Sequence, residues 1–393
     1  MPLRRTSSRA ERQLILLSAG TATRRAELSD HAERLAAGVD WRLLAATLGA
    51  RNLLTVLGPR LSDLARSHGD EEFSQDVERA LAARRHQSVF LALLGARVTS
   101  LLGQAGIRAS PLKGPQLGER IYGDPGRRPS SDVDLLVPAD RLQEAVEVVR
   151  GLGYQAPADE VNADGLPALH LAMVHERREL PPVELHWRVH WYESSFAGQR
   201  LLAPDGADPL TWRPAPGDEL AALLLFYARD GFVDVRLAAD LSAWWDVYGE
   251  QVDPGALSEL SASYPALARA LAVSAAVAHK LVGLPAARLL AGMPKPGLRD
   301  RGAIRLANPN PHTSRAQLYA DIGMIDALLM PRGELGAFIR RQVLPSRTVL
   351  EERTHATRQR RGGTRPGHAV RVVTRYAFTA ARLVRAPERP VLP

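Results

Sequence analysis

Residues 107–137, IRASPLKGPQLGERIYGDPGRRPSSDVDLLV, decide the fold that is predicted for this chain. The stretch reads as a strand, a glycine turn, a short helix (PQLGERIY), a loop and a second strand. Side chains alternate along a strand, so Asp132 and Asp134 point to one face while Val133 and Leu135 point to the other. Two carboxylates on one face repel each other unless a proton or a cation lies between them, and an oxygen-only pair suits Mg²⁺ better than zinc. The spacing therefore predicts that Asp132 and Asp134 bind a metal.

The turn between the first strand and the short helix is predicted to bind phosphate. Lys113 and Gly114 end the strand, and Pro115 suits the first position of a helix. Free backbone N–H groups at a helix N-terminus attract phosphate. Gly114 lets the backbone approach a ligand closely, and the ammonium group of Lys113 can pair with a phosphate oxygen.

The loop before the second strand offers further polar candidates. Arg128 is a candidate phosphate ligand, although the chain is rich in arginine and a surface role is the plainer alternative. Ser130 and Ser131 can either hydrogen-bond phosphate or cap the loop. We favour Ser131 for phosphate binding because it adjoins Asp132.

Two later segments predict a hairpin, HLAMVHE (170–176) and VELHWRVHW (183–191). The second predicted strand places Glu184, His186, Arg188 and His190 on one face. Glu184 is the natural third carboxylate of the site. His186 shares its face and is predicted to lie beside the metal ligands or the acceptor.

Four histidines in this hairpin, His170, His175, His186 and His190, suggest a zinc cluster as an alternative. We do not favour it, because His175 should point away from His170 and the chain has no cysteine. Core or cleft positions are the simpler interpretation of these side chains.

A phosphate-binding turn followed about 20 residues later by a same-face aspartate pair resembles the polymerase-beta nucleotidyltransferase superfamily. Within it the chain closely resembles the bacterial family of uncharacterised nucleotidyltransferases, over roughly residues 35–350. The resemblance is carried by LKG (112–114), RPSSDVDLLV (128–137), GY (153–154) and ELHW (184–187). The wider superfamily usually has Gly-Ser where this chain has Lys-Gly.

The resemblance implies an α+β fold in which a small mixed β-sheet core has flanking helices, an N-terminal helical region and a C-terminal helical bundle. It implies Mg²⁺-dependent transfer of a nucleoside monophosphate from a nucleoside triphosphate, with ATP favoured, and release of pyrophosphate. Asp132 and Asp134 would hold two Mg²⁺ ions, for which Mn²⁺ is a substitute, and Glu184 would complete the metal site and assist removal of the acceptor proton. The acceptor is expected to be a small molecule or peptide of a biosynthetic pathway.

Two alternatives stay open. One is a toxin-like nucleotidyltransferase that acts on tRNA, because such toxins share a Lys-Gly turn and an Asp pair. The other is a scaffold that binds nucleotide without transferring it. The sequence names neither the acceptor nor the oligomeric state.

Helical spacing of leucines before the first strand and helical patterns after residue 216 suggest how the chain is organised. The predicted parts are a flexible arm (1–30), an N-terminal helical subdomain (31–104), the nucleotidyltransferase core (105–200), a helical bundle (215–290), a linker with helices (291–345) and a basic C-terminal tail (346–393).

Composition excludes several classes of function. The 393 residues contain no cysteine, which excludes disulfides, thiolate zinc sites and cysteine nucleophiles. No run of about 18 apolar residues occurs, so we expect no membrane span and a cytoplasmic protein. The net charge is +8, but ten arginines against three glutamates after residue 350 supply +7 of it. Because the rest of the chain is nearly neutral, nucleic acid is a possible partner that we do not favour.

Overall fold

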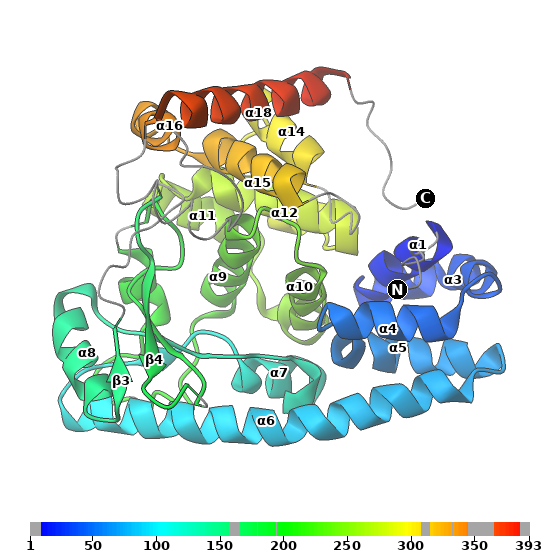
Figure 1. Ribbon diagram of the computed structural model, residues 1–393, viewed down its shortest axis with the longest axis horizontal. Helices are drawn as coiled ribbons and strands as arrows, with labels where there is room; N and C mark the ends of the chain where they lie inside the picture. Colours follow the sequence, from blue (N-terminus) through cyan, green and yellow to red (C-terminus); the bar gives the residue numbers. More distant parts are fainter. Residues whose placement is uncertain are drawn as a thin grey trace.

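The computed structural model describes residues 9–156, 166–178, 180–193, 195–307, 315–331, 333–344 and 365–385. Within these residues a small mixed sheet lies among many helices, as Figure 1 shows, and the predicted α+β class is confirmed. No helix among them is both long enough and apolar enough to cross a membrane.

The sheet has five strands in the order β1-β2-β5-β4-β3. Its strands are β1 (Ser110–Pro111), β2 (Val133–Leu136), β3 (Tyr154–Gln155), β4 (His170–His175) and β5 (Val183–His186). The neighbours β2 and β5 are parallel, and the other pairs are antiparallel. The register of the parallel pair sets Asp134 directly beside Glu184. Because paired residues point to the same face, this register brings the two carboxylates together.

Two strands are shorter than predicted. The first strand, expected over 107–112, is reduced to Ser110–Pro111. The strand expected over 183–191 ends at His186. The backbone N–H of Val189 donates a hydrogen bond to Oε1 of Glu193 over 3.0 Å instead of pairing in the sheet. The prediction that Arg188 and His190 share the strand face of Glu184 is therefore wrong.

One face of the sheet is apolar and is covered by two helices, α6 (Glu71–Gln104) and α8 (Leu142–Arg150). Val133 and Leu135 of β2 are buried in this layer, as alternation along the strand predicts. The cluster also includes Leu91, Val98, Leu102, Val146, Val149, Val183 and Leu185. The 34-residue helix α6 runs below the sheet and below α7 (Pro115–Tyr122) in Figure 1.

On the other side of the molecule a second, larger core joins the N-terminal helices to the helices after residue 215. It involves α4 (Trp41–Ala50), α5 (Leu54–Ser67), α9 (Pro216–Arg229), α10 (Val235–Tyr248) and α12 (Ala268–Val282). Fully buried leucines and alanines from these helices meet in it, among them Leu44, Leu57, Leu224, Ala239 and Ala278. Helices α9 and α10, which belong to this core, lie above α7 in Figure 1.

Residues 9–30 differ from the flexible arm that was predicted. They form α1 (Arg9–Ser18), α2 (Ala22–Glu27) and the start of α3 (Ser29–Ala36). Leu14 and Ile15 are buried in the larger core, and the N–H of Thr21 donates to the carbonyl of Val282 over 2.8 Å. Burial of this apolar run against distant helices orders the segment. Residues 1–8 of the predicted arm lie outside the described residues.

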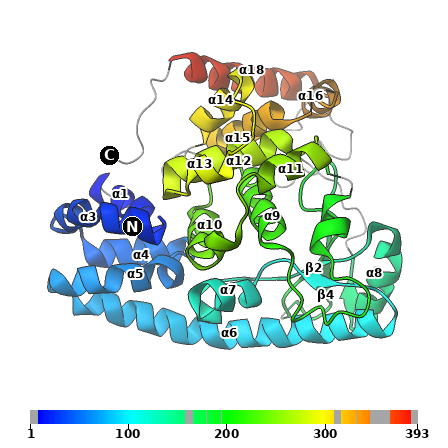
Figure 2. The same ribbon diagram turned by 180° about the vertical axis from the view of Figure 1, so that it is seen from behind.

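Six further helices of the described part of the chain lie toward the top of the molecule in Figure 2. They are α11 (Ala256–Ser263), α13 (Ala286–Leu289), α14 (Leu298–Leu306), α15 (Arg315–Leu329), α16 (Leu335–Val343) and α18 (Arg365–Arg385). Among them, α11, α13, α14 and α15 contribute buried side chains to the large core. Within the predicted basic tail, the structure describes α18. The rest of the tail, residues 345–364 and 386–393, lies outside the described residues.

Candidate functional site

The polar face of the sheet gathers the side chains that the sequence predicts for metal binding. Asp132 directly precedes β2, Asp134 lies within it, and Glu184 is the register partner of Asp134 on β5. The side chain of Asp134 is 1% exposed and that of Glu184 is 19% exposed. His186, two residues after Glu184, is fully buried on the same face.

The two carboxylate oxygens of Asp134 differ in their hydrogen bonding. Its Oδ1 lies 3.1 Å from Nζ of Lys113 and 2.9 Å from Nε2 of His186. Its Oδ2 is buried and has no hydrogen-bond partner among the residues that the structure describes. A buried carboxylate oxygen without a partner is costly, and a bound cation would satisfy it.

The three carboxyl groups ionise differently. Burial opposes ionisation of Asp134, but Lys113 and His186 outweigh it and lower its pKa. Burial and the neighbouring charge of Asp134 raise the pKa of Asp132. Glu184 is partly buried, yet its hydrogen bond with His186 lowers its pKa. Of the three acids, Asp132 is therefore the one whose pKa is raised.

The predicted turn adjoins the carboxylates. Gly114 has a φ of 95°, a value that favours glycine, and Pro115 is at the first position of α7 as predicted. No side chain caps this helix end. Lys113 lies with its ammonium 5.4 Å from the centre of the Phe226 ring, which positions it between α9 and Asp134.

Arg128 and Ser131 do not reach this face in the way that phosphate ligands would. Arg128 is buried, and its Nε donates to Oδ2 of Asp240 over 2.8 Å. Ser131 is exposed, whereas the hydroxyl of Ser130 lies 2.9 Å from Oδ1 of Asp132. The serine that contacts the predicted metal ligand is thus Ser130, the one that sequence reasoning ranked second.

Sequence reasoning missed the place of His170 in this face. Its Nε2 is 3.8 Å from Oε2 of Glu184, and its ring centre is 4.7 Å from that of His186. Burial and the neighbouring His186 lower the pKa of His170 to about 4. The antiparallel register pairs His170 with His186, so a correctly registered hairpin would have revealed the contact. His175 points away and packs against Tyr154, as predicted.

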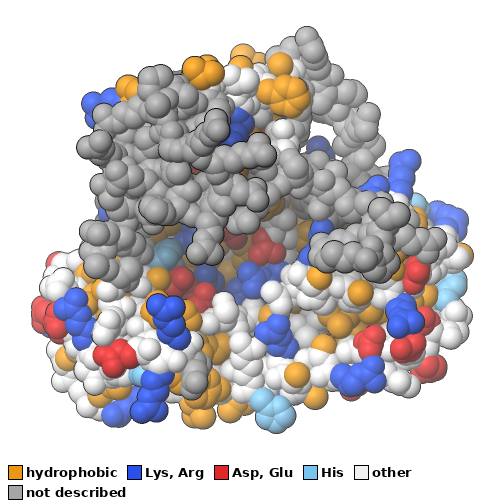
Figure 3. Space-filling view, in the orientation of Figure 1, with side chains coloured by type: hydrophobic (Ala, Val, Ile, Leu, Met, Phe, Trp, Pro, Cys, Tyr) orange, Lys and Arg blue, Asp and Glu red, His pale blue; other side chains and the backbone are white. Residues whose placement is uncertain are grey.

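Helix α9 contributes charged groups that no sequence signal indicated. Its last residue, Arg229, lies over the Phe226 ring with its guanidinium carbon 5.1 Å from the ring centre. Burial raises the pKa of the adjacent Asp230. In the space-filling view, acidic and basic side chains gather in a hollow between the sheet layer and α9 and α10 (Figure 3).

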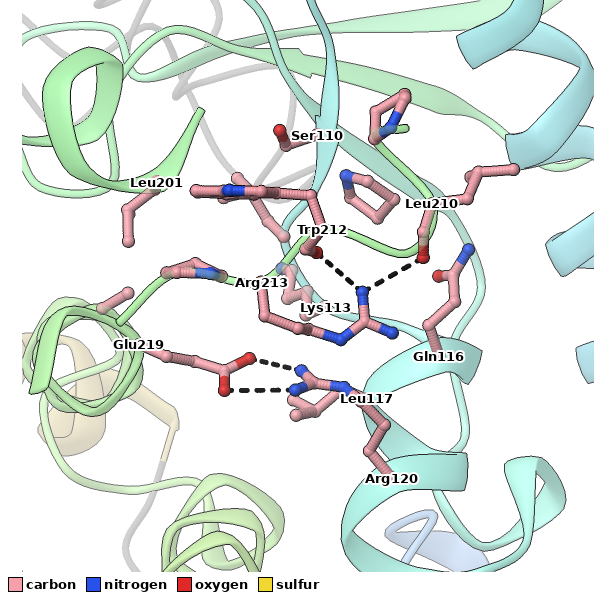
Figure 4. Close-up of a pocket in the computed structure, with 15 residues that line it drawn as sticks. Ser110, Lys113, Gln116, Leu117, Arg120, Leu201, Leu210, Trp212, Arg213 and Glu219 are labelled. Carbon is pink, nitrogen blue, oxygen red and sulfur yellow. Dashed lines mark hydrogen bonds and ion pairs between the residues drawn. The ribbon is translucent and has the colours of Figure 1, made fainter. Parts of the chain in front are cut away.

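A pocket lies on the other side of the Lys-Gly turn. Trp212 and Arg213, from the segment before α9, face Gln116, Leu117 and Arg120 of α7 across it (Figure 4). Arg120 and Trp244 both bond to Glu219, which fixes one wall. Lys113 and Gln116 line this pocket and also a smaller one that holds Asp132 and Asp134. The turn is thus shared by an aromatic pocket and an acidic one.

A comparison with known protein families found a match. A family model described as an uncharacterised nucleotidyltransferase matches residues 37–283, which is more than half of the chain. The match runs from just after α3 to just after α12 and so includes the whole polar face of the sheet. Neither a search of curated proteins nor a search of solved structures found a match.

Proposed function

The chain belongs to the uncharacterised nucleotidyltransferase family and is therefore a transferase; from this premise we propose that it moves a nucleoside monophosphate from a nucleoside triphosphate to a small acceptor. The observation that carries the proposal is the convergence of Asp132, Asp134 and Glu184 beside the Lys113 turn. ATP is the favoured donor.

The donor set fits a divalent cation of the kind that this family implies. Asp134 keeps a buried oxygen without a described partner, and the pKa of Asp132, raised by burial and by the charge of Asp134, reflects a repulsion that a cation relieves. Carboxylate oxygens are the ligands that Mg²⁺ prefers. Asp132, Asp134 and Glu184 would hold it. When bound, Mg²⁺ would neutralise charge on the phosphates of the substrate.

The chain's own groups would position the reaction. Lys113 and the uncapped N-terminus of α7 would bind the triphosphate, since both offer positive charge to phosphate oxygens. Glu184 would accept the proton of the acceptor as its oxygen or nitrogen attacks the α-phosphorus. The bond between that phosphorus and the β-phosphate oxygen breaks, and pyrophosphate leaves. His186 holds both Asp134 and Glu184 in place.

The pocket beyond the turn supports a small acceptor. It is lined by Trp212, Leu201 and Leu210 together with polar Gln116 and Arg213, a mixture that suits a small molecule or short peptide with an apolar part. It shares Lys113 with the acidic pocket. An acceptor bound there would lie next to the triphosphate.

Labelled nucleotides test the reaction type. The protein is incubated with Mg²⁺, each of the four nucleoside triphosphates labelled at the α- or γ-phosphate, and small-molecule and peptide fractions as acceptors. We expect the α label in a product and the γ label in pyrophosphate. Transfer of the γ label would contradict the proposal and indicate a kinase-type reaction.

Two further outcomes would also replace the proposal. Nucleotide binding without pyrophosphate release from any donor would indicate a non-catalytic scaffold. An α-labelled product that forms with bulk tRNA and is destroyed by ribonuclease would indicate the toxin-like reaction instead.

A further inference from the structure

A second set of ligand atoms lies on the polar face, toward β4. His170, Glu184 and His186 each offer one ligand atom, and these three atoms all lie within 4.8 Å of one another. Two of the three are imidazole nitrogens, so the set differs in chemistry from the oxygen-only pair of Asp132 and Asp134.

We propose that His170, Glu184 and His186 form a second site, for a transition-metal dication of the class of Zn²⁺, Co²⁺ and Ni²⁺. Imidazole is a good ligand for these metals, whereas Mg²⁺ binds oxygen ligands and keeps much of its water. Glu184 belongs to this set and is also the register partner of Asp134, so the two positions share it. The face then offers one position for a hard cation and one for a softer one.

The distances suit such an ion. Metal–nitrogen and metal–oxygen bonds of about 2.0–2.2 Å separate neighbouring ligand atoms in a tetrahedral site by about 3.3 Å. Glu184 Oε2 lies 3.2 Å from His186 Nε2 and 3.8 Å from His170 Nε2. Small shifts of these side chains would place all three around one ion.

The register of the hairpin builds this arrangement. His170 and His186 are direct partners across the antiparallel pair of β4 and β5, and Glu184 lies two residues before His186 on the same face. The partner of Glu184 on β4 is Ala172, whose small side chain leaves room for the carboxylate to turn toward the imidazoles. The geometry thus follows from the sheet itself and not from a flexible loop.

The surroundings of His186 suit a cation. Asp134 is buried, its Oδ1 adjoins Nε2 of His186, and its Oδ2 has no partner among the described residues. An ion held by His170, Glu184 and His186 would take the place of the contact between His186 and Asp134 and would lie beside this negative charge. Three protein ligands with one exchangeable position is the pattern of reactive rather than purely structural metal sites.

The role of such an ion in nucleotidyl transfer rests on the proposed function, but its binding does not. Beside Glu184 the ion would lie on the acceptor side, and the reaction would then require both Mg²⁺ and a trace transition metal. Preparations treated with a strong chelator would lose activity that Mg²⁺ alone does not restore.

Cobalt titration of the tag-free, chelator-treated protein tests the site directly, because Co²⁺ bound by imidazole and carboxylate absorbs visible light. We expect one equivalent to bind with a visible spectrum, and excess Mg²⁺ to leave the spectrum in place. His170→Ala removes a partly exposed ligand and should weaken Co²⁺ by at least ~100-fold, more than the 10–100-fold that loss of a supporting partner costs. Glu184→Gln, which keeps the side-chain shape, should have a similar effect.

Two matched variants serve as controls. His175 lies on the other face of β4, against Tyr154, so the variant His175→Ala should bind Co²⁺ like the wild type. Asp132→Asn should keep the cobalt spectrum while losing nucleotide transfer. No cobalt spectrum in the folded wild type, an unchanged spectrum in His170→Ala, or displacement by Mg²⁺ at comparable concentration would overturn the metal site.

Failure of the two proposals can be told apart. If Co²⁺ binds through His170 but no donor yields pyrophosphate, the metal site stands and the transferase mechanism does not. If transfer occurs with Mg²⁺ alone and Co²⁺ binds equally well to His170→Ala and to the wild type, the transferase mechanism stands and the metal site does not.

Discussion

The ion pair between Arg128 and Asp240 and the one between Lys113 and Asp134 have similar components but different surroundings. Asp240 is fully buried, and its two oxygens are both occupied, by Nε of Arg128 and by the hydroxyl of Tyr122, each over 2.8 Å. In Asp134 one oxygen accepts both neighbours, while the other has no partner among the described residues.

This difference separates a structural pair from a functional one. A buried ion pair that is completely hydrogen-bonded holds its segments together and has no capacity for a ligand. A buried carboxylate with an empty oxygen, next to a second acid whose pKa is raised, can accept a cation. Burial and charge alone therefore do not distinguish the two pairs, and we base the proposed assignment of the metal site on the unsatisfied oxygen beside the second acid.

The largest expected effect is on turnover. Asp132→Asn removes one ligand from the proposed metal site, and we expect the rate of pyrophosphate release to fall by at least ~10³-fold. The side chain is only partly buried, so the melting temperature should change little. Ser131→Ala, at the exposed neighbouring position, is the control and should stay active. Normal turnover by Asp132→Asn would remove the carboxylates from the mechanism.

A change in the ion pair of Arg128 and Asp240 should lower stability and not turnover. Arg128→Met leaves the charge of Asp240 buried without its partner, and we expect the free energy of unfolding to fall by about 3–5 kcal/mol. Arg128→Met/Asp240→Asn removes that charge and keeps an acceptor for Tyr122, so it should recover much of the loss. Urea denaturation measures both variants. A single variant as stable as the wild type would mean that the pair is not structural.

His190 extends the comparison to a buried group with no partner. Both its ring nitrogens are buried without a hydrogen bond to the described residues, and burial lowers its pKa to about 3. The unfolded chain, with an ordinary histidine pKa of 6.5, binds the proton more readily, so stability should fall as the pH drops from 6.5 toward 4. The loss should be on the order of 3 kcal/mol.

His190→Phe tests the assignment of this pH dependence. The variant lacks the titrating ring, so its stability curve between pH 6.5 and 4 should be flatter than that of the wild type. Equal slopes for the two proteins, measured by urea denaturation at several pH values, would show that His190 is not the buried neutral group.

The smallest expected effect is that of Lys113→Met. The variant removes a single point charge from the turn, and we expect the affinity for the nucleoside triphosphate to fall by about 10- to 100-fold. Stability should fall as well, because the buried Asp134 loses one of its two partners and keeps His186. The pKa of Asp134 should rise toward its ordinary value, because Lys113 helps to lower it. Activity should then be lost at a higher pH on acidification. An unchanged affinity for the nucleoside triphosphate would mean that Lys113 does not bind phosphate and only pairs with Asp134.

Local sequence patterns were sufficient to predict the parts of the site that depend on one strand or one turn. Alternation along residues 132–135 predicted which side chains enter the apolar layer, and Pro115 predicted the start of α7. Glu184 was placed correctly because its strand is regular up to His186.

Features set by distant contacts could not be predicted in this way. The pairing of Arg128 depends on Asp240, 112 residues further along the chain. The early end of β5 is accompanied by the bond between the N–H of Val189 and the side chain of Glu193. The helices in the expected N-terminal arm depend on burial of Leu14 and Ile15 against a core built mainly from later helices.

Calorimetric titration with ATP, GTP, CTP and UTP in the presence and absence of Mg²⁺ tests the central claim most directly, because it requires no knowledge of the acceptor. The wild type is compared with Asp132→Asn/Asp134→Asn. The matched control is Arg128→Met/Asp240→Asn, which changes the buried structural ion pair instead. We predict Mg²⁺-dependent binding of at least one nucleotide that is lost in the first variant and kept in the second. Binding that survives loss of both Asp132 and Asp134 would contradict the assignment of these two carboxylates to the nucleotide site. The absence of binding by the folded wild type would contradict it as well.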